Sequence, residues 1–207
     1  MIDQYGFPFL RGRVFDTIED DNGQYDDIRE VFWTCGAAMF IRKSALEKTG
    51  LFDETIVHHM DEIDLNWRMY LAGFCCKVVP KSVILHYGGA TIQAVSFKKM
   101  YWNHRNSIYL MAKNYNGLNA ITKTAVHYLL DYMAVAQSIV SFEFTRAKAI
   151  VAAHYWIMTH FFLILSKRKE IKARRTVKDA EILKRMYPKS VVLQYFFFKK
   201  KTYSALS

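Results

Sequence analysis

Three carboxylates crowd into one short stretch of this chain. The segment VHHMDEIDLNWRMYLAGF, residues 57–74, contains Asp61, Glu62 and Asp64, and an apolar, aromatic-rich run follows directly. Carboxylates this close repel one another and are costly to bury unless they are paired. One such group with a raised pKa is suited to general-base chemistry, because a base works best when its pKa lies near the working pH. The same spacing also fits a solvated first turn of a helix, where the helix dipole favours negative charge.

The residues after these acids predict a helix that buries one face. Glu62 lies about 100° around this helix from Ile63, so it need not share the buried face. Asp64 and Arg68 are four residues apart and are expected to pair, which leaves Glu62 as the better candidate for proton transfer. The apolar side chains that recur at helical spacing are Ile63, Trp67, Tyr70, Leu71 and Phe74.

The neighbouring stretches predict short strands and one short helix. VFWTCGAAMFI, residues 31–41, is a continuous apolar run that we expect to form a buried strand. Gly36 within it suggests close approach of another backbone or of a ligand. SALEKTG predicts a short helix with a capping box that starts at Ser44 and an end at Gly50. CCKVVP and SVILHY, further along the chain, indicate two more strands.

From about residue 97 the pattern becomes helical. FKKMYWNHRNSIYLMAKNY predicts one helix, and two long apolar segments, 120–142 and 149–165, predict two more. Polar residues interrupt both apolar segments, so neither is a clean membrane span of about 20 residues. We expect interfacial or re-entrant helices on the cytoplasmic face of a membrane, with a true span or a buried hairpin as alternatives. The interrupting residues are Lys123, His127, Asp131, His154 and His160.

Charge is divided unevenly along the chain. The sequence carries 29 Lys and Arg against 19 Asp and Glu, a net charge of +10. Residues 1–119 hold 13 basic and 14 acidic residues, whereas residues 120–207 hold 16 and 5. Because the cations of the second part flank apolar runs, an anionic membrane surface is favoured as a partner over nucleic acid. Three cysteines imply no disulfide framework and fit a reducing cytosolic setting.

Five linked motifs occur in order between about residues 5 and 116. They are YGFPFLRGRVF with GQYDD, GAAMFIRKSALEKTGLFDE, DEIDLNWRMYLAGF, VVPKSVILHYGG and HRNSIYLMAKNY. In this order they resemble the C-terminal part of the catalytic domain of family 2 glycosyltransferases, particularly the rhamnosyltransferase-like branch. The resemblance implies the acceptor-binding half of a GT-A fold, an α/β sandwich, over residues 1–116. Residues 117–207 resemble the hydrophobic tails that follow such domains, and we expect an α-helical, membrane-associated region there.

The resemblance also implies an activity. It is the inverting transfer of a sugar from a nucleotide-sugar donor to a glycan or lipid-linked acceptor, usually with Mg²⁺ or Mn²⁺. Glu62 takes the position of the family's general base, where many relatives have Asp, and Asp61 takes the acidic position before it. His86 matches a histidine that approaches the metal and diphosphate in some relatives. A strand-end histidine that is hydrogen-bonded in the core is the alternative for His86.

The resemblance also implies substrate-binding roles for further residues. Asp64 is better placed to hold Arg68 than to do chemistry. Arg105, which opens a helix together with Asn106, either braces the domain or touches phosphate. The predicted substrate-binding residues are Gly36, Asp53, Asp64, Arg68 and Arg105.

The Asp-x-Asp motif that this family requires has no strong counterpart before residue 31. The acidic run at 19–21 follows no apolar strand and lies in a polar stretch. We therefore expect the chain to represent the C-terminal half of a longer enzyme and to be inactive alone. The alternative function is a non-catalytic membrane or assembly module that retains a glycosyltransferase remnant. Nucleic-acid binding is weaker, because the basic part has no recognisable binding fold.

Overall fold

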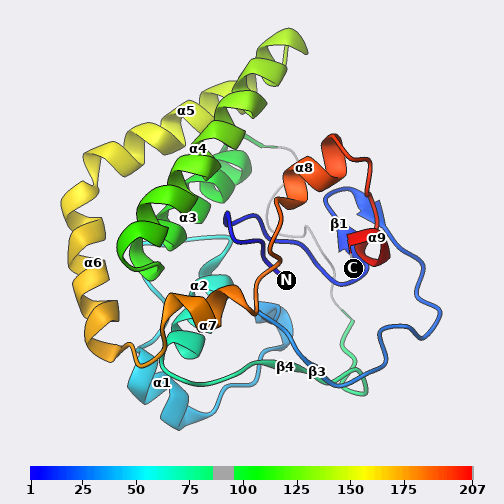
Figure 1. Ribbon diagram of the computed structural model, residues 1–207, viewed down its shortest axis with the longest axis vertical. Coiled ribbons are helices and arrows are strands. Elements are labelled where there is room, and N and C mark those ends of the chain that lie inside the picture. Colours follow the sequence, from blue (N-terminus) through cyan, green and yellow to red (C-terminus); the bar gives the residue numbers. More distant parts are fainter. Residues whose placement is uncertain (86–95, 207) are drawn as a thin grey trace.

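The computed structural model describes residues 1–85 and 96–206. The first part of the chain is mostly loops with short strands and helices, and the longest helices follow residue 96 (Figure 1). In chain order the elements are β1 (Arg13–Val14), β2 (Thr17–Ile18), β3 (Arg29–Glu30), the 3₁₀ helix η1 (Gly36–Ala38), α1 (Lys43–Thr49), α2 (Asp61–Leu71), β4 (Lys77–Val78), α3 (Phe97–Asn114), α4 (Gly117–Val140), α5 (Phe144–Thr159), α6 (Phe161–Arg174), α7 (Asp179–Leu183), α8 (Val191–Phe196) and α9 (Tyr203–Leu206).

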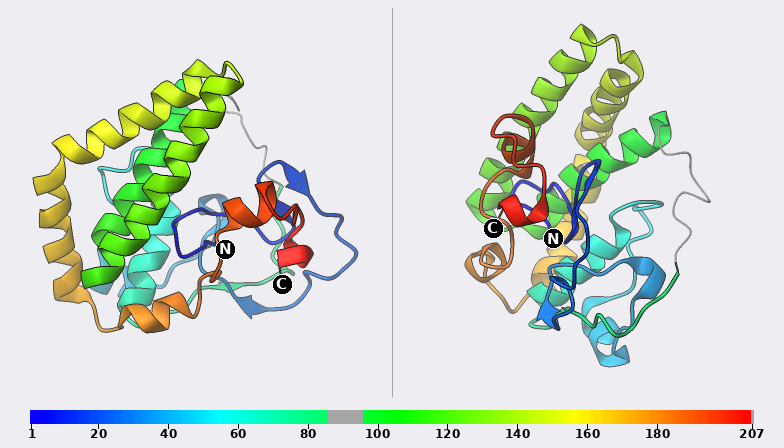
Figure 2. Two further views of the ribbon diagram at one scale, coloured as in Figure 1. Left: turned by 45° about the horizontal axis from the view of Figure 1, so that its top comes forward. Right: turned by 90° about the vertical axis from the view of Figure 1, so that its right-hand side faces the viewer.

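Helix α3 forms the centre of the structure. Helices α4, α5 and α6 pack along it, and α2 contacts it as well (Figures 1 and 2). Four consecutive α3 residues, 108–111, are almost completely buried, which is the pattern of a helix covered on all sides. Trp67 of α2 packs edge-on against Tyr115, with 4.8 Å between ring centroids. The start of α2 is therefore positioned by its packing against the end of α3.

The two ends of the chain lie close together (Figure 1). Asp3 is fully buried and accepts hydrogen bonds from the backbone N–H groups of Tyr5, Phe7 and Val191, each at 2.9 Å. Burial nevertheless raises the pKa of Asp3 to about 7. A second small core joins the two ends and consists of Phe9, Val14, Val191, Tyr195 and Leu206.

The sheets are short, and the predicted strand over residues 31–41 is wrong. Strand β3 pairs antiparallel with β4, and the Val31 N–H then donates to the Cys76 carbonyl at 3.0 Å. Beyond that bond the described residues supply no neighbouring strand, so the apolar run turns into loop and η1. A strand needs a partner for its backbone groups. Val31 and Phe32 stay in the core, whereas most side chains from Cys35 onward reach the surface, and that of Phe40 is 95% exposed.

The prediction of a strand in CCKVVP is confirmed at β4. Residues 82–85, the described part of the second predicted strand, SVILHY, form no strand. The remaining residues of that motif, His86 included, and the predicted turn at 88–91 lie outside the described residues.

The predicted helices are confirmed, with changes at their ends. Helix α1 begins after Arg42 rather than after Ser44, so the predicted capping box is wrong, but Gly50 ends the helix at a positive φ of 81°. Helix α2 begins at Asp61 with the acids in its first turn, as predicted. The second long apolar segment is divided at His160 into α5 and α6.

The main hydrophobic core contains residues from both sides of the predicted domain boundary at residue 116. Ile157, Ile164, Ile171 and Ile182 pack in the same cluster as Trp67. The described residues contain two two-stranded antiparallel sheets, and the GT-A half-domain stays a prediction. Taken singly, none of the described helices has the length and apolar character to cross a bilayer, whereas α5 and α6 meet those criteria as a pair bent by 70°.

Candidate active site

The acidic helix start is preceded by a strained turn. His59 and Met60 both adopt the left-handed conformation, with φ values of 60° and 66°. Non-glycine residues in this region cost roughly 1–2 kcal/mol each, and such strain gathers at functional sites. The side-chain amide of Asn106 donates to the carbonyls of His58 and His59 at 2.7 and 2.8 Å. Helix α3 thus holds the turn that sets the direction of the first residues of α2.

Arg105 braces the same loop. Its Nε donates to Asn106 Oδ1 at 2.8 Å, and its Nη2 donates to the Thr55 carbonyl at 2.7 Å. The guanidinium also lies over the ring of Trp156, 4.6 Å from the centroid. Of the two roles considered from sequence, the structure shows bracing, while contact with substrate phosphate stays a prediction.

Glu62 has the electrostatic character of a proton-transfer group. Its side chain is mostly buried, and burial raises its pKa to about 7, with the neighbouring Asp61 carboxylate contributing to the rise. A carboxyl that titrates near 7 can both accept and release a proton at neutral pH. This first turn of α2, with Asp61 and Glu62, is the acidic turn.

Gly36 lies beside Glu62. A Cβ atom built on Gly36 would lie 3.9 Å from Glu62 Cβ, an ordinary van der Waals distance, so η1 borders the acidic turn without crowding it. This neighbour is a side chain at an ordinary distance, so the expected close approach of another backbone at Gly36 stays a prediction. Contact of Gly36 with a sugar stays a prediction.

Asp53, Asp64 and Arg68 belong to a different arrangement, which we call the buried ionic chain (Asp53, Lys113, Asp64 and Arg68). Arg68 Nε lies 2.9 Å from Asp64 Oδ2, so the predicted pair is confirmed. Lys113 Nζ lies 2.9 Å from Asp64 Oδ1 and also contacts Asp53 Oδ2. All four residues are buried. The chain of charges connects α2, α3 and the loop after α1, and a substrate-binding role for its members stays a prediction.

The charges of the buried ionic chain neutralise one another. Burial alone would raise the pKa of Asp64, but the Lys113 ammonium and the Arg68 guanidinium outweigh it and hold that pKa below its ordinary value. Asp64 and Glu62 are two residues apart, yet their pKa values are displaced in opposite directions. Asp64 is held as a paired anion, whereas no cation among the described residues forms an ion pair with Glu62.

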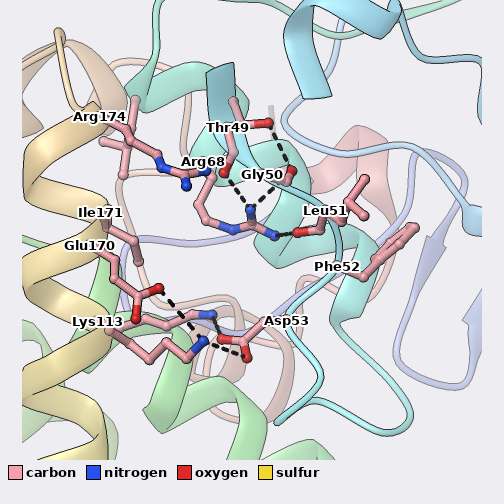
Figure 3. Close-up of a pocket in the computed structure, with 12 residues that line it drawn as sticks. Thr49, Gly50, Leu51, Phe52, Asp53, Arg68, Lys113, Glu170, Ile171 and Arg174 are labelled. Atoms are coloured by element: carbon pink, nitrogen blue, oxygen red, sulfur yellow. Dashed lines mark hydrogen bonds and ion pairs between the residues drawn. The ribbon is translucent and has the colours of Figure 1, made fainter. Parts of the chain in front are cut away.

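A pocket of about 220 Å³ opens beside the buried ionic chain (Figure 3). In this view the Arg68 side chain points at the carbonyls of Thr49, Gly50 and Leu51, and its Nη1 and Nη2 donate to Thr49 and Leu51 at 2.9 and 2.8 Å. Four cationic side chains line the pocket against two carboxylates, which makes it basic. Its charged lining residues are Asp53, Arg68, Lys113, Lys167, Glu170 and Arg174.

Two carboxylates of the acidic turn could hold a divalent ion, which stays a prediction. Mg²⁺ commonly uses one or two carboxylates together with water and substrate phosphates, so Asp61 and Glu62 fit that chemistry. His86, the predicted metal ligand, lies outside the described residues, and its role stays a prediction. His58 and His59 contact the ring of Trp102, with centroid distances of 4.7 and 6.3 Å.

Comparison with known proteins gives a partial match. No protein-family model matches the chain, and no solved structure matches it. The chain is similar to N-acetylglucosaminyl-diphospho-decaprenol L-rhamnosyltransferase from two strains of Mycobacterium tuberculosis, CDC 1551 / Oshkosh and ATCC 25618 / H37Rv, at 27% identity over 89 residues. The match covers 43% of this chain and 29% of each relative. The similarity supports a glycosyltransferase-like relationship at this coarse level.

Two parts of this region were not foreseen from sequence. Lys113 was not singled out, although it is the cation shared by both buried aspartates. A single lysine in a helical segment gives little signal without the fold, because its partners Asp53 and Asp64 lie 60 and 49 residues earlier in the sequence. In the sequence, Asn106 stands out only as the neighbour of Arg105. Its hydrogen bonds to the strained turn join it to a loop 47 residues earlier.

Replacing Lys113 tests the buried ionic chain. Lys113→Met leaves Asp53 and Asp64 buried with one cation fewer, and removal of one partner from such a set costs about 3–5 kcal/mol. We expect the free energy of unfolding in urea to fall by that amount. Lys98→Met, at an exposed position of the same helix, is the control and should stay within about 0.5 kcal/mol of wild type. Equal stability of the two variants would contradict this role.

The pH dependence of stability tests the raised pKa of Glu62. Because the folded pKa is about 7 and the unfolded value 4.5, the wild-type free energy of unfolding should fall as pH rises between them. Glu62→Gln keeps the side chain neutral, so its Tm should match wild type at pH 4. At pH 8 its Tm should exceed that of wild type by about 6–12 °C, because the shift corresponds to about 3 kcal/mol and each kcal/mol to about 2–4 °C. Glu54→Gln, at an exposed position, should show no such pH-dependent gain. A Glu62→Gln effect equal at both pH values would refute the raised pKa.

Proposed function

We propose that this chain carries the acceptor-side catalytic region of an inverting glycosyltransferase, with Glu62 as the general base. The partial similarity to a rhamnosyltransferase supports glycosyltransferase activity at a coarse level. The observation that carries the assignment of the base is the buried position of Glu62 beside Asp61, which raises its pKa to about 7. Fold-level analogy alone would not identify the residue.

The chemistry required matches this environment. In an inverting transfer the acceptor hydroxyl attacks the anomeric carbon, the bond to the nucleotide diphosphate breaks, and a base takes the hydroxyl proton. A carboxylate with a pKa near neutrality is ionised often enough to accept that proton and basic enough to hold it. Asp61 is proposed to keep Glu62 basic through its negative charge, and to help hold a divalent ion against the departing diphosphate.

The proposed substrates follow from the relatives. Their printed name specifies a lipid-linked acceptor, N-acetylglucosaminyl-diphospho-decaprenol, and transfer of L-rhamnose. We propose a nucleotide-activated sugar as donor and a glycan carried on a polyprenyl diphosphate as acceptor. Because such an acceptor is anchored in lipid, we propose that the reaction occurs at a membrane surface, on its cytoplasmic face.

Membrane association is supported by exposed apolar groups next to cations. Phe196, Phe197 and Phe198 are all exposed and are followed directly by Lys199, Lys200 and Lys201. Aromatic rings beside lysines suit the interface of an anionic bilayer, where each cation contributes about 1 kcal/mol. We define residues 196–201 as the Phe-Lys segment and propose that it contacts anionic lipid.

Glu62→Gln in the native enzyme tests the base. The amide occupies similar space but cannot take a proton, so turnover with a nucleotide-sugar and a polyprenyl-diphosphate acceptor should fall by about 10²–10⁴-fold. The fall of the wild-type rate below pH 7 should be absent from the residual rate of the variant. Glu54→Gln is the matched control, and its turnover should be unchanged. A Glu62→Gln enzyme with near wild-type turnover would remove Glu62 from the mechanism.

Vesicle binding tests the Phe-Lys segment. Phe197→Ser removes an aromatic side chain that is 76% exposed and should weaken binding to vesicles of anionic lipid by about 10-fold. Phe40→Ser removes an equally large exposed ring without a neighbouring triple lysine run and should bind as wild type does. Equal loss in both variants, or stronger binding of wild type to DNA than to the vesicles, would contradict the membrane assignment.

A further inference from the structure

Three histidines surround one buried aspartate in the helical part of the structure. Asp131 of α4 lies between His104 of α3 and His154 of α5: His104 Nδ1 is 2.8 Å from Asp131 Oδ1, and His154 Nε2 is 2.8 Å from Asp131 Oδ2. His127, one helical turn before Asp131, places its Nε2 3.6 Å from Asp131 Oδ2. This cluster uses none of the residues proposed for sugar transfer.

His127 is held in the form of a metal ligand. Its Nδ1 lies 2.6 Å from the Tyr5 carbonyl, which can only accept, so Nδ1 carries the proton. Phe7 stacks on the ring at a centroid distance of 4.4 Å and fixes its plane. Metal-binding histidines commonly donate their other ring N–H to a backbone carbonyl in this way.

The second nitrogen of His127 lacks a hydrogen-bond partner. The side chain is fully buried, and Nε2 makes no hydrogen bond to any described residue. With the Nδ1 proton engaged by Tyr5, Nε2 lies nearest to the Asp131 carboxylate, another acceptor. The distance of 3.6 Å is too long for a hydrogen bond. Two buried electron-pair donors that face each other are stabilised by a cation between them.

We propose that His104, His127 and Asp131 bind one zinc-type divalent cation. One ligand atom from each residue lies within 4.8 Å of the other two, a separation that a single ion can span. Two imidazole nitrogens and one carboxylate oxygen suit Zn²⁺, at about 2.0–2.2 Å from each, better than Mg²⁺, which prefers an all-oxygen shell.

His154 supports the site from outside it. Its Nε2–H donates to the carboxylate of Asp131 and so orients this ligand, as neighbours of metal sites do. The rings of Tyr128 and Tyr132 pack against His154 at centroid distances of 4.5 and 5.4 Å. A bound ion would connect α3 with α4, and the hydrogen bond from His154 to Asp131 would connect α5 with the same site.

Zinc titration of the purified full chain tests the proposal. After removal of metals with a chelator, wild type should bind one Zn²⁺ in competition with a chromogenic chelator, its Tm should rise with added Zn²⁺, and Mg²⁺ should not compete. His127→Gln should weaken zinc binding by at least about 100-fold and abolish the rise in Tm. The readout does not depend on transfer activity, so this proposal and the proposed function can fail separately.

Two further variants keep the test decisive. His104→Gln changes a ligand whose side chain is 17% exposed, and it should show the same loss if His127→Gln does not fold. His160→Gln, at the break between α5 and α6 and outside the cluster, is the matched control and should bind zinc as wild type does. Wild-type zinc affinity no greater than that of His104→Gln would overturn the site.

Discussion

The shared lysine of the buried ionic chain is the constraint on which the rest of the site depends. Lys113 contacts Asp53 and Asp64 at once, and Arg68 holds the second aspartate from the other side. Charges of this kind are tolerated in a protein interior only when each is paired. Pairing them fixes the loop after α1, the helix α2 and the core helix α3 relative to one another. The acidic turn takes its place at the start of α2 as a consequence.

The pKa values of two acids in this segment, Glu62 and Asp64, are displaced in opposite directions. Asp64 faces Lys113 and Arg68 and stays ionised, whereas Glu62 is buried beside another acid and has a pKa of about 7. The strained turn at His59 and Met60 directs the helix start, and Asn106 from α3 holds the turn. A structural anion and a proton acceptor are therefore produced by the same short segment, and the difference lies in which helix faces each side chain.

Local patterns predicted the helices well and the contacts between them poorly. The period of Ile63, Trp67 and Tyr70, and the spacing of Asp64 and Arg68, are local signals, and both agree with the structure. The run over 31–41 was assigned to a strand because it is apolar and β-branched, yet a strand also needs a partner that sequence does not specify. The grouping of His104, His127, Asp131 and His154 depends on the packing of three helices. In sequence these residues appeared only as interruptions of apolar segments.

We propose that the acidic turn holds a carboxyl poised for proton transfer at neutral pH. The most direct test is a ¹³C NMR titration of the Glu62 side-chain carboxyl in the folded protein, with the resonance assigned by its absence from Glu62→Gln. We expect a titration midpoint near 7. A midpoint near the ordinary value for glutamate, about 4.3, would contradict it, since such a group would be too weak a base for the role.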